Sequence, residues 1–208
     1  MVRTVMDVMG LANRRPGAYA EASMNSSEEL IARARRGDEA AFRFIFERYT
    51  RPVISFIFYM VNRRDLAEDL AQETFVRAYK SIYKLRDDAK LSTWLFGIAK
   101  NVARESLRAR LRETQSVDCH SVSEACDERA SPVNKLLDKE LEGVLSHALA
   151  ELGEDKRLVF VLKVYQRHSY EEISEITGFS IPKIRNDLYR ARAELRQLVS
   201  PYLLKSDR

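Results

Sequence analysis

Three cations and one amide recur along residues 92–112, STWLFGIAKNVARESLRARLR. Lys100, Arg104 and Arg108 follow one another at intervals of four residues, and Asn101 lies beside the first of them. On a helix, at about 100° per residue, this spacing gathers all four side chains on one face. The other face is apolar and can pack on a core; it comprises Leu95, Ile98, Ala99, Val102 and Ala109. A row of cations with an amide suits a long anionic partner, as nucleic acid is.

A second basic surface is expected near the C-terminus. Ser169 and Glu172 have the spacing of a capping box, and Gly178 can end the short helix that they begin. Ser180 can cap a following helix, so the pattern predicts a helix-turn-helix. The buried stripe of its second helix is expected to be Ile184, Leu188, Ala191 and Leu195. The candidate contacts with bases and phosphates are Ser180, Lys183, Arg185, Asn186, Tyr189 and Arg190.

Each basic face has a simpler alternative, because a solvated helix surface is also rich in Lys and Arg. Asp187 illustrates the choice. It could accept a hydrogen bond from the amino group of cytosine, or it could pair with Lys183 or Arg190 and only support the helix. Its place near the buried stripe favours the pair. The presence of two basic faces in one chain favours contact with DNA over two solvated surfaces.

A third face is acidic. In residues 65–75, DLAEDLAQETF, the polar positions Asp65, Glu68, Asp69, Gln72 and Glu73 fall on one side, while the apolar positions Leu66, Leu70 and Phe75 turn inward. This face would repel phosphate, so we expect it to point away from DNA. It is either a solvated surface or a docking surface for a basic protein.

Composition and patterning set the fold class. The chain has 208 residues, a net charge of +4 and only seven glycines, and helix-period patterning continues from about Ser26 without strand alternation. We predict an all-α fold of two helical domains joined by a flexible linker. The expected parts are an N-terminal arm, 1–23, a first domain, 24–112, an acidic linker, 113–135, and a second domain, 136–208. Either Met24 is the true start or the arm is disordered.

Several functions are not supported by the sequence. No apolar run approaches the roughly 18 residues of a membrane span, and the N-terminal apolar stretch is interrupted by Asp7, so we expect a cytoplasmic protein without membrane insertion. Cys119, His120 and Cys126 in the linker suggest zinc, but structural zinc sites usually have four ligands, and chance proximity is favoured. We therefore predict no metal and no cofactor. Without a nucleophile motif or a phosphate-binding glycine loop, we do not expect an enzyme.

The chain resembles the extracytoplasmic-function (ECF) sigma factors, small promoter-specificity subunits of bacterial RNA polymerase. The resemblance covers about residues 26–200 and rests on four segments in family order: ELIARARRGDEAAF, AEDLAQETFVRAY, STWLFGIAKNVAR and YEEISEITGFSIPKIRNDLYRARAEL. It implies a sigma-two domain, a linker that threads toward the polymerase active site, and a sigma-four domain. It also implies core RNA polymerase, promoter DNA and an anti-sigma factor as partners.

The resemblance assigns roles to the three faces. Asp69, Gln72 and Glu73, with Asp65 beside them, match the segment that docks on the clamp of the largest polymerase subunit. The helix of Lys100, Asn101, Arg104 and Arg108 matches the segment that reads and melts the minus-ten element, and residues 86–90, RDDAK, match the loop that receives a flipped base. For Trp94, core packing is favoured over base stacking. The helix-turn-helix matches the reader of the minus-thirty-five element, with departures at Pro182 and Asp187.

Two other functions are considered. One is a free-standing helix-turn-helix regulator whose N-terminal half senses a signal or dimerises, and the other is an RNA-binding adaptor. The acidic face and the second basic face argue against both.

Overall fold

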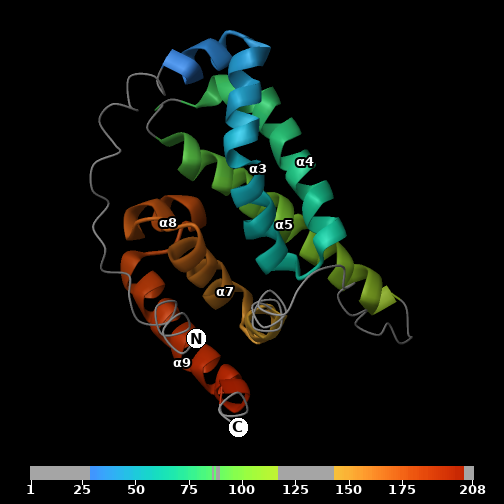
Figure 1. Ribbon diagram of the computed structural model, residues 1–208, viewed down its shortest axis with the longest axis vertical. Coiled ribbons are helices and arrows are strands. Elements are labelled where there is room, and N and C mark those ends of the chain that lie inside the picture. Colours follow the sequence, from blue (N-terminus) through green and yellow to red (C-terminus); the bar gives the residue numbers. More distant parts are fainter. Residues whose placement is uncertain (1–28, 86, 88–89, 117–142, 204–208) are drawn as a thin grey trace, which may run out of the picture.

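The computed structural model describes residues 29–85, 87, 90–116 and 143–203, and the regular elements in these ranges are helices (Figure 1). The all-α prediction is therefore confirmed. The first half contains a short helix, 29–35, followed by α3 (Glu39–Val61), α4 (Arg64–Ser81), η1 (Ile82–Lys84) and α5 (Leu91–Ser116). The second half contains a helix, 143–151, followed by α7 (Glu154–Phe160), the π-helical η3 (Val161–Tyr165), α8 (Tyr170–Thr177) and α9 (Ile181–Leu203).

Some sequence predictions concern parts of the chain outside this description. They are the N-terminal arm with Met24, and most of the linker with Cys119, His120 and Cys126. Within the described ranges, no group of three or more His, Cys, Asp or Glu side chains could hold a metal ion. A search of the same ranges finds no helix with the length and apolarity needed to cross a membrane.

The start of α3 follows the sequence signals, but its continuation does not. Gly37 adopts a positive φ of 88°, and the Asp38 carboxylate caps α3 by accepting the amide N–H groups of Ala40 and Ala41. Pro52 lacks an amide N–H and is uncommon inside a helix, and an apolar stretch follows it in the sequence, yet α3 runs through this residue to Val61. Burial of the residues after Pro52, among them Val53 and Phe56, holds the helix on the core despite the missing N–H donor.

The helix α5 is longer than predicted. It runs to Ser116, so the first residues of the predicted linker are helical, and the boundary between domain and linker stays a prediction. Leu95, Ala99 and Val102 are buried as expected, and Ile98 is partly buried. Ala109 is exposed, which corrects its assignment to the apolar face. The reason is that core packing on α5 ends before this residue, and all of residues 108–112 are exposed.

The second half contains the predicted helix-turn-helix. The Ser169 hydroxyl accepts the amide N–H of Glu172, and the Glu172 carboxylate accepts the amide N–H of Ser169, which completes the capping box of α8. Gly178 ends α8 with a φ of 78°, a conformation that costs a glycine little. The predicted buried stripe of α9 is confirmed at Ile184, Leu188, Ala191 and Leu195.

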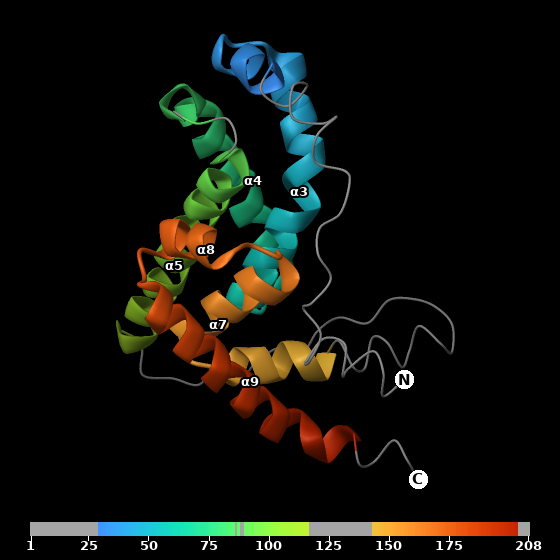
Figure 2. The same cartoon turned by 90° about the vertical axis from the view of Figure 1, so that its left-hand side faces the viewer.

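The two halves pack on each other. Figures 1 and 2 place α8 beside α5, and one continuous set of buried apolar residues includes members of both halves. The rings of Tyr59 in α3 and Tyr165 in η3 lie 4.2 Å apart between centroids, and the Ser146 hydroxyl donates to the side-chain oxygen of Asn62 at 2.7 Å. The basic face of α5 therefore has a neighbour within the same chain.

Candidate nucleic-acid interface

The four predicted minus-ten residues of α5 divide into two pairs. Asn101 and Arg108 are exposed, as a DNA-facing surface requires. Lys100 and Arg104 are only partly exposed and contact the second half of the chain. The four residues lie on the helix as predicted from the sequence, but at Lys100 and Arg104 the second half of the chain partly covers this face.

The contacts of Lys100 and Arg104 are polar and specific. The Lys100 ammonium donates to the carbonyl oxygen of Ile176 at 2.7 Å. The Arg104 guanidinium donates through Nε to Glu154 at 2.5 Å and through Nη2 to Asp155 at 3.0 Å. Burial, followed by the nearby positive charge of Arg104, lowers the pKa of Lys100 from its ordinary value.

The outward face of α9 is open. Arg185, Asn186, Tyr189 and Arg190 are all exposed, and Tyr189 retains 75% of its surface. Ser180 precedes the helix, and its carbonyl oxygen accepts the amide N–H of Ile184 at 3.0 Å. An exposed row with two cations and an amide at the start of a recognition helix is suited to base edges and phosphates in a major groove.

Lys183 differs from the other candidates on α9. Its ammonium donates to Asp187 at 2.6 Å and to Asp155 at 2.9 Å, and it lies 3.9 Å from the centre of the Phe179 ring. Burial opposes the charge of Lys183, but the hydrogen bonds to Asp187 and Asp155 outweigh this effect and raise its pKa. The predicted pairing of Asp187 with Lys183 is thereby confirmed.

The acidic residues of α4 form a separate exposed surface. Asp65, Glu68, Asp69, Gln72 and Glu73 are all exposed, whereas Leu66 and Leu70 are partly buried and Phe75 is buried. Arg63 pairs with Asp65, and its hydrogen bond, followed by that of the Leu66 amide, lowers the pKa of Asp65. Glu73 pairs with Arg77 at 2.7 Å. Among the described residues, Asp69 has no ion-pair partner and is available to an external cation.

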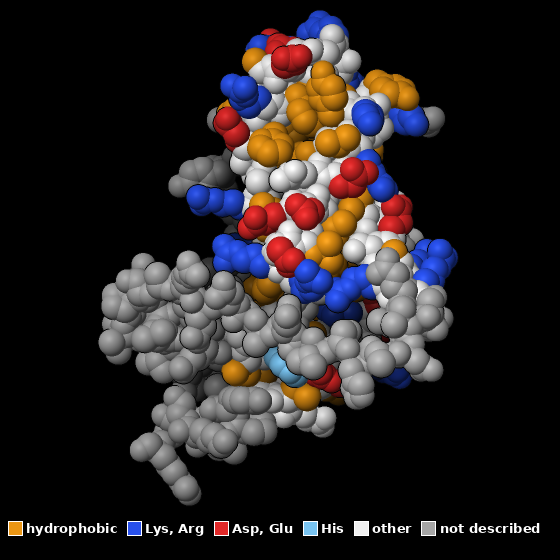
Figure 3. All heavy atoms as spheres, turned by 90° about the vertical axis from the view of Figure 1, so that its right-hand side faces the viewer, with side chains coloured by type: hydrophobic (Ala, Val, Ile, Leu, Met, Phe, Trp, Pro, Cys, Tyr) orange, Lys and Arg blue, Asp and Glu red, His pale blue; other side chains and the backbone are white. Residues whose placement is uncertain are grey.

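An apolar groove that the sequence did not reveal lies next to this row. Figure 3 shows apolar side chains gathered on the upper part of this face, with acidic side chains below them. The groove is lined by Phe42, Phe46, Gln72, Phe75, Val76, Tyr79 and Lys80. Phe46, Val76 and Tyr79 each retain more than a third of their surface. The sequence signal that could have indicated this groove is a set of apolar residues at helical spacing outside the core stripe. The same spacing is typical of buried residues, so it does not distinguish a groove from a core.

The loop predicted to receive a flipped base is only partly described. Arg86, Asp88 and Ala89 lie outside the described residues, and Lys90 pairs with Glu175 of α8 at 2.6 Å. The prediction that Trp94 packs on the core is confirmed, since it is partly buried against both apolar clusters of the protein.

Comparison with known proteins places these surfaces in a family. Residues 45–113 match the family described as Sigma-70 region 2, and residues 143–195 match Sigma-70, region 4. The ECF RNA polymerase sigma-E factor of Escherichia coli K12 is 30% identical over 185 residues, covering 86% of this chain and 96% of that protein. The RNA polymerase sigma-H factor of Pseudomonas aeruginosa is 28% identical over 188 residues, covering 87% and 97%.

A solved structure agrees with this relationship. The sigma factor RpoE of Bartonella quintana, crystallised with the anti-sigma factor NepR, aligns with a TM-score of 0.63 at 26% identity. The alignment covers 76% of this chain and 96% of that one. The matched regions include the acidic row, the basic face of α5 and the helix-turn-helix, in the order found in sigma factors. The chain therefore belongs to the ECF family of RNA polymerase sigma factors.

Proposed function

We propose that this sigma factor divides its work among three surfaces: α4 docks on core RNA polymerase, α5 acts on the minus-ten element, and α9 reads the minus-thirty-five element. The observation that carries the proposal is the exposed acidic row of Asp65, Asp69, Gln72 and Glu73 beside the apolar groove. In a protein whose other two surfaces are basic, this row suits a basic protein and not DNA. The apolar groove beside the acidic row adds apolar surface that is removed from water when a partner docks.

The two basic helices have different tasks in this proposal. On α5, Lys100, Arg104 and Arg108 hold the phosphates of the separated strand, and Asn101 contacts an unstacked base. On α9, Asn186 and the neighbouring arginines contact base edges in the major groove of the intact duplex. The polymerase carries out nucleotide addition, so the sigma factor is not itself an enzyme, and it acts in the cytoplasm with the polymerase.

We also propose control by an anti-sigma factor. The support is the similarity to RpoE of Bartonella quintana, which was crystallised with one. The apolar groove of α3 and α4 offers a surface where such a protein could exclude the polymerase clamp.

Charge reversal on α4 tests the docking surface. We expect Asp69→Lys with Glu73→Lys to abolish binding to core polymerase, because two like charges would face a basic clamp at a cost of several kcal/mol, consistent with about 1.5–7 kcal/mol measured for close interfacial charge pairs. The measurement is a pull-down with core polymerase, with circular dichroism to check the fold. Glu151→Lys with Glu171→Lys, at exposed positions of the second half, is the matched control. Undiminished association of the α4 variant would show that polymerase docks elsewhere.

The regulator alternative has its own test. A gel shift of promoter DNA is carried out with the isolated chain and again with core polymerase present. We expect a sequence-specific complex only with polymerase. Tight and specific binding by the isolated chain would favour a free-standing regulator.

A further inference from the structure

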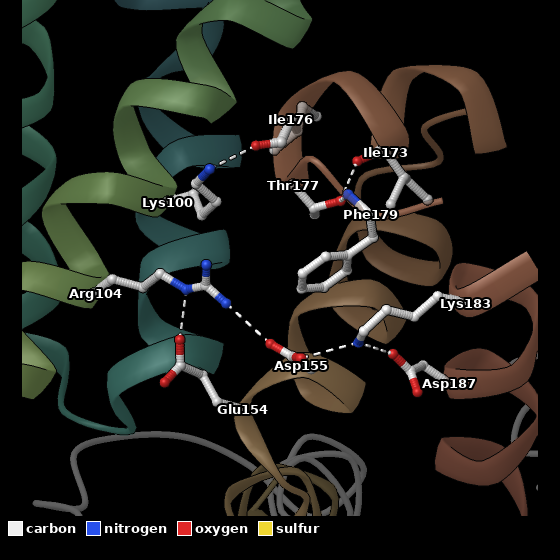
Figure 4. A network of polar contacts seen from close by, with 10 residues as sticks. All are labelled: Lys100, Arg104, Glu154, Asp155, Ile173, Ile176, Thr177, Phe179, Lys183 and Asp187. Atoms are coloured by element: carbon white, nitrogen blue, oxygen red, sulfur yellow. Dashed lines mark hydrogen bonds and ion pairs between the residues drawn. The ribbon is translucent and has the colours of Figure 1, made fainter. Parts of the chain in front are cut away.

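One carboxylate joins cations from both basic helices. Asp155, in the first turn of α7, accepts from Arg104 of α5 through Oδ1 and from Lys183 of α9 through Oδ2, at 3.0 Å and 2.9 Å (Figure 4). Its neighbour Glu154 accepts from the Nε atom of Arg104. Two of the three nitrogen atoms of the Arg104 guanidinium are thus occupied by carboxylates, and its side chain retains only 20% of its surface.

Further contacts link α8 to the first half in the same way. The Lys100 ammonium reaches the carbonyl of Ile176, in the last turn of α8, where carbonyl oxygens lack partners within the helix and attract cations. Lys90 pairs with Glu175 one residue earlier. The contacts of Lys90, Lys100 and Arg104 join cations of the first half to acceptors of the second, across 50 to 85 residues of sequence.

An apolar seam lies alongside the polar contacts. The ring of Phe96 in α5 meets the buried ring of His168 edge to face at 4.9 Å, and Tyr59 meets Tyr165. The apolar contacts of the seam hold the halves together and do not depend on charge. The polar contacts determine which charged side chains are covered. Those side chains are Lys100 and Arg104, which would otherwise be open to phosphate.

We propose that Glu154 and Asp155 act as an internal substitute for DNA phosphate and hold the free sigma factor in a closed, DNA-excluding state. Carboxylate and phosphate oxygens compete for the same guanidinium hydrogens, so Arg104 cannot engage both in this geometry. Asp155 and Lys183 lie in the same half, so separation of the halves frees Arg104 and Lys100 of α5 and leaves the pair of Lys183 with Asp155 in place. The minus-ten and minus-thirty-five elements are separated along the promoter, so α5 and α9 must move apart to reach both. In this proposal, binding to core polymerase opens the chain. The DNA-excluding role rests on the proposed function of α5, but closure itself does not.

The test uses the full chain with the carboxylates neutralised at constant shape, Glu154→Gln with Asp155→Asn. The amides retain the volume and an acceptor oxygen but not the negative charge, so Arg104 loses its ion pairs with both residues and keeps at most weaker hydrogen bonds. The matched control is Glu151→Gln with Glu171→Gln, which removes two exposed carboxylates from the same half. Any general gain in attraction to DNA from lost negative charge is shared by both variants.

Closure is measured first, without DNA. Dyes are attached at Glu47→Cys on α3 and Gln197→Cys on α9, both exposed positions, in a chain whose native thiols are removed by Cys119→Ser and Cys126→Ser. Single-molecule energy transfer then gives the fraction of open molecules. We expect this fraction to rise several-fold in the Gln/Asn variant and to stay at the wild-type value in the control. An equal open fraction in variant and control overturns the proposal.

DNA access is measured second, by fluorescence anisotropy with a labelled single-stranded DNA of mixed sequence. We expect the Gln/Asn variant to bind several-fold more tightly than the control. A variant that opens but gains no affinity over the control overturns the DNA-excluding role. In the open variant, Arg104→Ala should remove most of the gain. If the gain persists without Arg104, the assigned role of α5 is wrong, while the carboxylate lock stands.

Discussion

The two basic helices of this sigma factor, α5 and α9, each carry Lys and Arg residues and an Asn on one face, but their surroundings differ. On α9, Arg185, Asn186, Tyr189 and Arg190 face solvent, whereas Lys183 is held by the carboxylates of Asp155 and Asp187. On α5, Asn101 and Arg108 face solvent, while Lys100 and Arg104 are covered by α7 and α8. The difference shows that periodicity tells which side chains share a face, but not whether another part of the chain occupies it.

The largest expected effect compares one aromatic residue on each helix. Phe96 of α5 retains 2% of its surface and packs against Phe56 and His168, so we expect Phe96→Ala to lower the free energy of unfolding by about 3–5 kcal/mol. Tyr189→Ala on α9 should change it by no more than about 0.5 kcal/mol, because Tyr189 is exposed. Urea denaturation followed by circular dichroism measures both. A small loss for Phe96→Ala would show that the seam between the halves contributes little stability.

Much of each helix was predictable, because its signals are local. The Asp38 cap, the capping box of Ser169 and Glu172, and the buried stripe that begins at Ile184 all depend on residues within a few positions of one another. The pairing of Lys183 with Asp187 is also local, one helical turn apart. The exposure of the acidic row followed from the same periodicity.

The features that sequence reasoning missed depend on distant partners. Arg104 meets Glu154 across 50 residues, and Lys100 meets Ile176 across 76, separations at which no spacing rule operates. The exposure of Ala109 depends on where packing against the other helices stops, and the passage of α3 through Pro52 depends on the core that holds it. Tertiary packing decides these cases over local preference.

The second effect concerns the covered cations of α5. We expect Lys100→Ala with Arg104→Ala to weaken open-complex formation by holoenzyme. The plot of the logarithm of the equilibrium constant for open-complex formation against log[salt] should become less steep by about 0.7 per residue, the value for single-stranded contacts. Asn101→Ala should instead change base preference in the minus-ten element, since its side chain carries no charge. Permanganate footprinting of thymines across a salt series gives the measurement. Wild-type reactivity of the double variant at all salt concentrations would rule out a melting role for these two cations.

The third effect contrasts neighbours on α9. Asn186 is exposed and can pair with adenine, so Asn186→Ala should cost about 1–3 kcal/mol at one upstream base pair and relax discrimination there. Asp187 retains 13% of its side-chain surface and is bound by Lys183, so Asp187→Ala should change promoter choice little. In vitro transcription from promoters randomised in the minus-thirty-five element compares the two. A new base preference in Asp187→Ala, with none lost in Asn186→Ala, would reverse the roles.

The smallest effect concerns His168, at the seam where α5 meets the second half. Burial lowers the pKa of His168. The nearby Glu172 carboxylate opposes this effect, and the positive charge of Lys163 strengthens it. The unfolded chain, with an ordinary pKa of about 6.5, then binds more protons than the folded chain. Stability is therefore fully present above pH of about 6.5 and declines as the pH falls toward the lower folded-state pKa, by less than about 1.4 kcal/mol per pH unit.

Replacement of His168 by a ring of similar shape isolates this titration. His168→Phe keeps an aromatic ring against Phe96 and removes an imidazole whose Nε2 has no hydrogen-bond partner among the described residues. We expect urea midpoints of this variant to decline less than those of wild type between pH 7 and pH 5, while His147→Gln, at an exposed position, serves as the control. Because the ring lies between the halves, the open fraction of wild type should also rise in the same pH interval. An identical pH dependence in wild type and His168→Phe would assign the acid sensitivity to other groups and leave the seam without a titrating residue.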